Sequence, residues 1–208
     1  MSQGYFITFE GGEGSGKSTQ IRRLAERLKP GGREVVLTRE PGGTPGGEEI
    51  RNLILNGAVD RWSPVSEALL MSAARRDHLE RVIRPALDRG AIVLCDRFAD
   101  STRAYQGSGG AVDPAFIDSL ERFVVEATRP HLTLILDLPV AEGLARAGAR
   151  GGEARFESKG LAFHERLRTA YLAIAEAEPQ RCQVIDATGT QNQVAAAIDA
   201  ALAARLGL

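Results

Sequence analysis

The chain has 208 residues, which is enough to bury the core of one domain and short for two independent domains. Its 26 basic and 27 acidic residues nearly balance, so the overall charge points to no nucleic-acid or membrane partner. The N-terminus carries no basic segment followed by an apolar stretch, and no window approaches the ~18 uninterrupted apolar residues of a membrane span. We therefore expect a soluble, cytoplasmic protein.

Five short runs of apolar and β-branched residues are typical of strands. They cover residues 5–10, 34–38, 91–95, 132–137 and 182–186. The third and fourth runs are apolar almost throughout, as expected of parallel strands that are covered on both faces. Cys95 and Cys182 each lie in such a run, which favours two reduced core thiols over a disulfide or a metal pair.

Longer segments with helical periodicity separate these runs. The predicted helices are residues 18–29, 48–55, 64–89, 114–126, 141–147, 161–177 and 193–206. Because strands alternate with helices, we predict an α/β fold over residues 1–208, with a five-stranded parallel sheet and helices on both faces. Two glycine-rich connections, residues 41–47 and 148–152, are either plain surface turns or loops that approach a ligand.

Residues 11–18, Gly-Gly-Glu-Gly-Ser-Gly-Lys-Ser, match the G-x-x-x-x-G-K-[ST] pattern of a phosphate-binding P-loop. The motif follows a predicted strand and precedes a predicted helix, and this context separates it from a chance glycine-rich turn. Backbone N–H groups of such a loop turn toward phosphate oxygens, Lys17 reaches the β- and γ-phosphates, and the Ser18 hydroxyl ligates Mg²⁺. The predicted ATP-binding residues are Gly11, Gly12, Glu13, Gly14, Ser15, Gly16, Lys17, Ser18 and Thr19.

A carboxylate directed at Mg²⁺ commonly ends an apolar strand near the P-loop. Asp96 and Asp137 both end such strands. Asp96 is the better candidate, because Arg97 follows it at once and the carboxyl end of a strand opens onto the ligand crevice in this architecture. For Asp137, capping the next helix is an equal alternative.

The chain has no Asn-Lys-x-Asp stretch of the kind with which GTPases recognise guanine. It has several arginines near predicted strand ends and loops instead: Arg39, Arg51, Arg75, Arg97, Arg150 and Arg155. A single arginine is more often a solvated surface charge than a ligand. Several around a phosphate site suit a second phosphorylated molecule, because guanidinium groups pair bidentately with phosphate.

Three further segments follow the P-loop: residues 38–43 (Thr-Arg-Glu-Pro-Gly-Gly), residues 96–107 (Asp-Arg-Phe-Ala-Asp-Ser-Thr-Arg-Ala-Tyr-Gln-Gly) and residues 185–188 (Ile-Asp-Ala-Thr). In order and spacing, from residue 5 to the C-terminus, the chain resembles the bacterial thymidylate kinases. The resemblance implies the P-loop NTPase fold of nucleoside-monophosphate kinases. It also implies transfer of the γ-phosphate of ATP to dTMP, giving dTDP for dTTP biosynthesis.

The same resemblance implies how dTMP is held at its phosphate. Arg39 and Arg97 match the residues that hold the monophosphate, and Arg51 helps to position that side of the acceptor. Glu13 matches an acidic position that faces the 3′-hydroxyl and the phosphate.

At the base, Arg75 matches the arginine that contacts a thymine carbonyl, while Thr102 and Gln106 match positions that recognise the pyrimidine edge. Tyr105 lies beneath the deoxyribose, where it crowds a 2′-hydroxyl. Many relatives have a phenylalanine that stacks on thymine where this chain has Met71. A thioether can lie on an aromatic ring at ~0.3–1.5 kcal/mol, and packing in the core is the equal alternative for Met71.

Members of this family place a catalytic arginine either in the P-loop or in a mobile lid. Gly14 occupies the P-loop position here, and residues 146–157 resemble an arginine-bearing lid, which we place at about residues 147–159. Arg155 is the first candidate and Arg150 the second, and such an arginine is worth ~10³–10⁵ in rate. The implied catalytic residues are Lys17, Arg97, Arg155, Arg150 and Glu13.

Two other functions are weighed against this one. A kinase for UMP/CMP or AMP shares the fold, but the Ser-Thr-x-Ala-Tyr-Gln segment at residues 101–106 argues against it. A non-catalytic P-loop switch is disfavoured by the lid arginines. The family is typically homodimeric, and the apolar pattern of residues 64–87 fits a dimer face or internal core equally well.

Overall fold

The computed structural model describes residues 3–58, 60–149 and 159–208. Arg150 and Arg155, and with them most of the predicted lid, lie outside the described residues. Within the described ranges no helix is long and apolar enough to cross a membrane.

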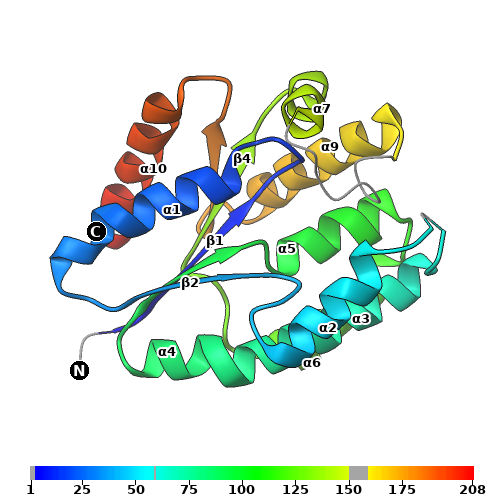
Figure 1. The fold of residues 1–208 in the computed structure, drawn as a ribbon, viewed down its shortest axis with the longest axis horizontal. Helices are drawn as coiled ribbons and strands as arrows, with labels where there is room; N and C mark the ends of the chain where they lie inside the picture. Colours follow the sequence, from blue (N-terminus) through cyan, green and yellow to red (C-terminus); the bar gives the residue numbers. More distant parts are fainter. Residues whose placement is uncertain (1–2, 59, 150–158) are drawn as a thin grey trace.

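Five parallel strands in the described part of the chain form one sheet (Figure 1). They are β1 (Tyr5–Glu10), β2 (Val35–Arg39), β3 (Ile92–Asp96), β4 (Leu132–Asp137) and β5 (Cys182–Asp186). The order is β2-β3-β1-β4-β5, so the chain fills one side of β1 before it crosses to the other. The carboxyl end of β1 is therefore a topological switch point, where ligands bind in open α/β sheets. The predicted α/β class, with a five-stranded parallel sheet, is confirmed.

Alternate residues of β1 point to opposite faces of the sheet, and each face carries its own helices. Ile7 and Phe9 pack in one core cluster, whereas Phe6 packs in another. The first cluster also holds residues of α1 (Lys17–Leu28) and α10 (Gln191–Leu206). The opposite face carries the helical segment from residue 64 to 88, together with α6 (Pro114–Val125) and α9 (Leu161–Ala177).

The predicted helix over residues 64–89 is interrupted. It consists of α3 (Pro64–His78), a π-helical stretch η2 (Leu79–Ile83) and α4 (Arg84–Asp88). Pro85, near the start of α4, lacks an N–H and cannot continue the regular bonding of an α-helix, and the π-helical stretch directly precedes it. Another helix, α2 (Pro45–Leu55), starts three residues before the predicted 48, because Thr44 caps it by accepting a hydrogen bond from the Gly47 N–H.

A helical segment that the sequence did not predict covers residues 99–109. It comprises α5 (Ala99–Thr102) and the π-helical η3 (Arg103–Gly109). Its sequence carries Ser, Thr and Gly in place of an apolar stripe, so helical periodicity gave no signal. The two cysteines are free and buried, as favoured.

Candidate active site

The P-loop connects β1 to α1, and the ammonium group of Lys17 is folded back onto it. Its Nζ donates to the carbonyls of Gly11 (3.0 Å) and Gly12 (2.8 Å) and to Ser15 Oγ (3.3 Å). Burial lowers the pKa of Lys17 to about 8, and the positive charge of Arg97 adds to the effect. The loop thus holds a buried cation on acceptors that phosphate oxygens can replace.

The packing of Gly14 leaves no room for a side chain at this position of the P-loop. Gly14 has φ +70°, and a Cβ there would lie 2.0 Å from the carbonyl oxygen of Gly143 in α7 (Val140–Gly148). In return, a Cβ on Gly143 would lie 2.5 Å from the Glu13 carbonyl oxygen. Backbone meets backbone at this contact, so any side chain at residue 14 would push α7 away from the loop.

Ser18 and Asp96 form the pair expected of a magnesium site. The Ser18 hydroxyl donates to Asp96 Oδ2 over 2.7 Å, and Asp96 ends β3 directly beside β1. Asp137 pairs instead with Arg168, whose Nε and Nη2 donate to it over 2.7 and 2.9 Å. Its predicted alternative as a helix cap is wrong, because α7 follows Pro139 with no side-chain cap.

A pocket of about 360 Å³ opens in front of the P-loop, within the range of roughly 300–1,000 Å³ that is usual for small-molecule sites. Its lining includes most of the predicted site: Glu13, Gly14, Ser15, Gly16, Lys17, Ser18, Arg39, Arg51, Met71, Arg75, Asp96, Arg97, Thr102, Tyr105 and Gln106. Three predicted ATP-binding residues, Gly11, Gly12 and Thr19, do not line it.

Arg97 lines this pocket and adopts a left-handed backbone conformation, with φ +70°. Its Nη2 donates to Glu13 Oε1 over 3.0 Å. Its Nη1 donates to the Gly11 carbonyl (3.2 Å), Ser101 Oγ (3.3 Å) and Tyr171 OH (3.2 Å). A non-glycine residue in this conformation is held by its surroundings, and such strain concentrates at functional sites.

Glu13 joins the P-loop to Arg97 and to Tyr105. Besides the Arg97 contact, its Oε1 accepts a hydrogen bond from the Tyr105 hydroxyl over 2.7 Å. Burial would raise the pKa of Glu13, but the charges of Arg97 and Lys17 and the Tyr105 bond outweigh it and lower the pKa to about 2. The carboxylate is therefore ionised at neutral pH.

The far end of the pocket is built from buried, mutually bonded side chains. Arg75 Nε donates to Glu40 Oε2 (2.7 Å) and its Nη1 to Thr102 Oγ1 (3.1 Å). Gln106 Nε2 donates to Glu67 Oε2 over 3.2 Å. Sequence reasoning missed Glu40 and Glu67. The first lies inside the Arg-Glu-Pro motif and could have been noticed, whereas nothing local marks the second.

The other two predicted phosphate-side arginines, Arg39 at the end of β2 and Arg51 on α2, are exposed and half-buried respectively and bond to nearby residues of the chain. Arg39 Nη2 contacts Glu48 Oε2 at 3.0 Å, and Arg51 Nη1 donates to the Pro41 carbonyl over 2.9 Å. Met71 lines the pocket and also packs against the apolar cluster that contains Tyr105, so its stacking on thymine stays a prediction.

Comparison with known proteins gives one consistent result. A model of the family described as thymidylate kinase matches residues 9–198. A thymidylate kinase from Caulobacter vibrioides is 68% identical over 208 residues, with all of both chains covered. One from Nitrobacter winogradskyi is 55% identical and covers 96% of this chain and 88% of its own. The crystal structure of an Ehrlichia chaffeensis thymidylate kinase superposes with a TM-score of 0.80 at 38% identity, covering 96% of this chain and 99% of that one.

The charged pocket around the P-loop, the parallel sheet and relatives matched along 88–100% of their length agree. The chain belongs to the thymidylate kinase family, the kinases that phosphorylate dTMP to dTDP with ATP.

Proposed function

We propose that this pocket holds ATP and dTMP together and passes the γ-phosphate of ATP to a phosphate oxygen of dTMP, giving ADP and dTDP. The observation that supports the proposal is that residues suited to two nucleotides line one and the same pocket. Lys17 and Ser18, suited to the triphosphate, share it with Arg97 and Arg75, suited to a second nucleotide. Glu13 connects the two halves through its bonds to Arg97 and Tyr105.

On the donor side, residues 11–19 bind the triphosphate, and Lys17 exchanges the Gly11 and Gly12 carbonyls for phosphate oxygens. The exchange is favourable because a phosphate oxygen carries negative charge and a carbonyl oxygen does not, so the ammonium gains an ion pair. The positive end of α1 points the same way and adds to the attraction.

The oxygens of Ser18 and Asp96 suit Mg²⁺, which prefers hard oxygen ligands and takes the rest of its shell from water and substrate phosphates. These two residues would hold the ion. When bound, it neutralises charge on the phosphates and orients them.

On the acceptor side, Arg97 and Arg39 hold the monophosphate, with Arg51 supporting that side and Glu13 facing the sugar. The acceptor oxygen needs no general base, because the second pKa of a phosphate monoester is about 6. Catalysis therefore rests on alignment and on neutralising charge, which positioned cations supply.

The buried end of the pocket selects the base. Arg75 bonds a thymine carbonyl, Thr102 and Gln106 contact the pyrimidine edge, Met71 lies against the ring, and Tyr105 crowds a 2′-hydroxyl. Thymine and uracil differ by one methyl group, worth ~1–3 kcal/mol or ~10–200-fold in an apolar pocket. The enzyme therefore also phosphorylates dUMP, at a lower rate.

A lid arginine completes the site, with Arg155 first and Arg150 second. Both lie outside the described residues, so their role rests on the family resemblance. The close contact of Gly14 with Gly143 supports it, because it leaves no room for a P-loop arginine. Closure of the lid would also keep water from the transferring phosphate.

Arg155→Ala tests the lid in a coupled assay of ADP release, with dTMP and ATP binding measured by calorimetry. We expect binding to persist while kcat falls ~10³-fold or more. Wild-type turnover in the Arg150→Ala, Arg155→Ala double variant would discard the lid assignment. Chromatographic detection of dTDP in the same reactions separates a kinase from a non-catalytic nucleotide switch, which would form none.

We also propose that the enzyme works as a cytoplasmic homodimer. The family resemblance supports this, as do the exposed apolar side chains of Val65, Leu69 and Phe123 on the packed pair α3 and α6. Light scattering of the purified protein tests the dimer, and a monomer at micromolar concentration would contradict it.

A further inference from the structure

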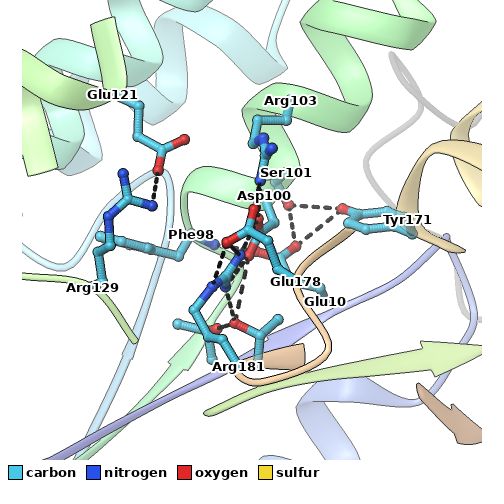
Figure 2. A network of polar contacts seen from close by, with 12 residues as sticks. Glu10, Phe98, Asp100, Ser101, Arg103, Glu121, Arg129, Tyr171, Glu178 and Arg181 are labelled. Carbon is cyan, nitrogen blue, oxygen red and sulfur yellow. Dashed lines mark hydrogen bonds and ion pairs between the residues drawn. The ribbon is translucent and has the colours of Figure 1, made fainter. Parts of the chain in front are cut away.

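Glu10 is a fully buried carboxylate to which the proposed mechanism gives no task. It ends β1 one residue before the P-loop, with 0% of its surface exposed. Its Oε1 accepts from the Phe98 N–H over 2.7 Å. Its Oε2 accepts from the hydroxyls of Ser101 (2.6 Å) and Tyr171 (3.1 Å). Figure 2 shows both hydroxyl groups turned toward the Glu10 carboxylate.

Each of these three donors leads to Arg97. Phe98 follows it in the chain, so the bond from the Phe98 N–H to Glu10 fixes the peptide that leaves the left-handed turn at Arg97. The Ser101 and Tyr171 hydroxyls both accept from Arg97 Nη1, at 3.3 and 3.2 Å. Glu10 thus supports Arg97 at the backbone and at the guanidinium, although the two side chains share no direct bond.

Phe98 also reaches the base end of the pocket, through the peptide that follows it. The Phe98 carbonyl accepts from Arg75 Nη2 over 2.9 Å. One carboxylate therefore anchors a turn on which both the phosphate-side and the base-side arginine depend.

We infer that Glu10 is the positioning residue that aims Arg97, and through Phe98 also Arg75, at dTMP. The inference rests on the proposed roles of these two arginines. A purely structural role would be served by an apolar side chain, because burying a charge costs more than burying a hydrocarbon. The carboxylate is useful here because it is an acceptor for three donors at once.

The surroundings of Glu10 place its titration near neutral pH. Burial raises its pKa to about 7, helped by the negative charge of Asp100 on α5 and opposed by the Ser101 bond, Arg97 and the Phe98 N–H. Among the residues that the structure describes, Lys17 on α1, Cys95 on β3 and Tyr171 on α9 also interact electrostatically with it. A protonated Glu10 carries a donor of its own, so one of the neighbouring hydroxyls has to turn and accept from it, and the present set of bonds changes.

Glu10→Gln tests the inference, because the amide keeps the shape of the side chain and resembles the protonated acid. Its oxygen can accept from the Phe98 N–H. Its NH₂ group is a donor, and it faces the two hydroxyls that donate to the carboxylate in the wild type. We expect KM for dTMP to rise roughly 10- to 100-fold, as a misaligned binding group does, with a smaller change in KM for ATP.

Two pH-dependent measurements separate positioning from a merely structural role. The amide shift of Phe98 in ¹⁵N-labelled wild type should titrate near pH 7 and should stay flat in Glu10→Gln. The stability of the wild type should fall as pH rises from 4.5 toward 7, since the native state binds the proton more tightly, and the variant should lose this dependence. We therefore expect Glu10→Gln to bind dTMP more weakly than the wild type and, above pH 7, to be at least as stable as the wild type.

Tyr171→Phe and Ser101→Ala each remove one hydroxyl between Glu10 and Arg97, and each should raise KM for dTMP less than Glu10→Gln does. Asp100→Asn should shift the Phe98 titration to lower pH, because Asp100 raises the pKa of Glu10. If Glu10→Gln does not fold, the wild-type Phe98 titration and Tyr171→Phe decide the matter.

An unchanged KM for dTMP in Glu10→Gln, or in Tyr171→Phe where that variant decides, together with a Phe98 amide that does not titrate, would overturn the inference. Arg97→Ala distinguishes this result from a failure of the proposed function. If Arg97→Ala loses dTMP and Glu10→Gln does not, only the role of Glu10 fails. If Arg97→Ala also binds dTMP normally, the proposed acceptor site itself is wrong.

Discussion

The two ends of the acceptor pocket are built in opposite ways. At the base end, Arg75, Thr102 and Gln106 are 4%, 4% and 2% exposed, and each bonds to another buried side chain. At the phosphate entrance, the side chain of Arg39 is 54% exposed and pairs with Glu48. If the pocket holds dTMP as proposed, the base end is arranged before the nucleotide arrives, whereas Arg39 would exchange a protein carboxylate for a phosphate.

This difference decides how much each residue contributes. Replacing a group at the buried end leaves its partner buried and unpaired, which costs about 1–3 kcal/mol or more. An exposed ion pair is screened by water and contributes ~0–1 kcal/mol. We therefore expect substitutions at the base end to change KM for dTMP strongly and substitutions at the entrance to change it little. Replacing Lys17, the P-loop lysine, should have a larger effect than either.

Lys17→Ala should have the largest effect, a loss of kcat of at least ~10²–10³-fold, because it removes a buried cation from the developing charge on the phosphates. A steady-state assay of ADP release measures it. Lys29→Ala is the matched control at the other end of α1, where Lys29 pairs with Glu26 on the surface. An unaffected rate in Lys17→Ala would contradict the assignment of the P-loop itself.

Arg75→Lys should come next. Lysine keeps the charge but cannot hold Glu40, Thr102 and a base carbonyl at once, so we expect KM for dTMP to rise about 10- to 100-fold, the equivalent of losing ~1.5–3 kcal/mol. The preference for dTMP over dCMP should fall with it. Arg76→Lys, on the exposed side of the same helix, should change neither quantity. Equal effects in both variants would remove the contrast between the two ends.

Arg39→Ala should raise KM for dTMP by less than ~10-fold, in keeping with a solvent-exposed charge pair. Arg89→Ala removes an arginine paired in the same way with Glu34 and should leave KM unchanged. A rise in Arg39→Ala as large as that in Arg75→Lys would show that the entrance contributes as much as the buried end.

Glu48→Gln should have the smallest effect and the opposite sign. It removes the negative charge that competes with the dTMP phosphate for Arg39, yet its amide oxygen can still accept from the Gly43 N–H. We expect KM for dTMP to fall by up to ~3-fold, as an exposed ion pair implies. A higher KM would mean that Glu48 positions Arg39 instead of competing for it.

The same contrast separates what the sequence could predict from what it could not. The P-loop and the carboxylate that ends β3 are local patterns, so Ser18 and Asp96 could be proposed as partners, although the sequence did not predict that β3 lies beside β1. Family resemblance added Arg75 and Gln106, but not the buried acids Glu40 and Glu67 that hold them.

The residues that position the site and that the sequence did not predict come from distant parts of the chain. Tyr171 reaches Glu10 across 161 positions, and no local pattern joins a tyrosine on a C-terminal helix to a strand near the N-terminus. The helix that carries Thr102 was missed because its polar residues face the pocket and leave no apolar stripe. The packing of Gly14 against Gly143 was invisible for a related reason, since it depends on how α7 meets the loop.

The most direct test of the proposed function is the rate of ADP release by the wild-type enzyme across a panel of acceptors, with ATP and Mg²⁺ held constant. We expect kcat/KM to be highest for dTMP, ~10–200-fold lower for dUMP and lower again for CMP, UMP and AMP. A preference for AMP or CMP over dTMP would contradict it.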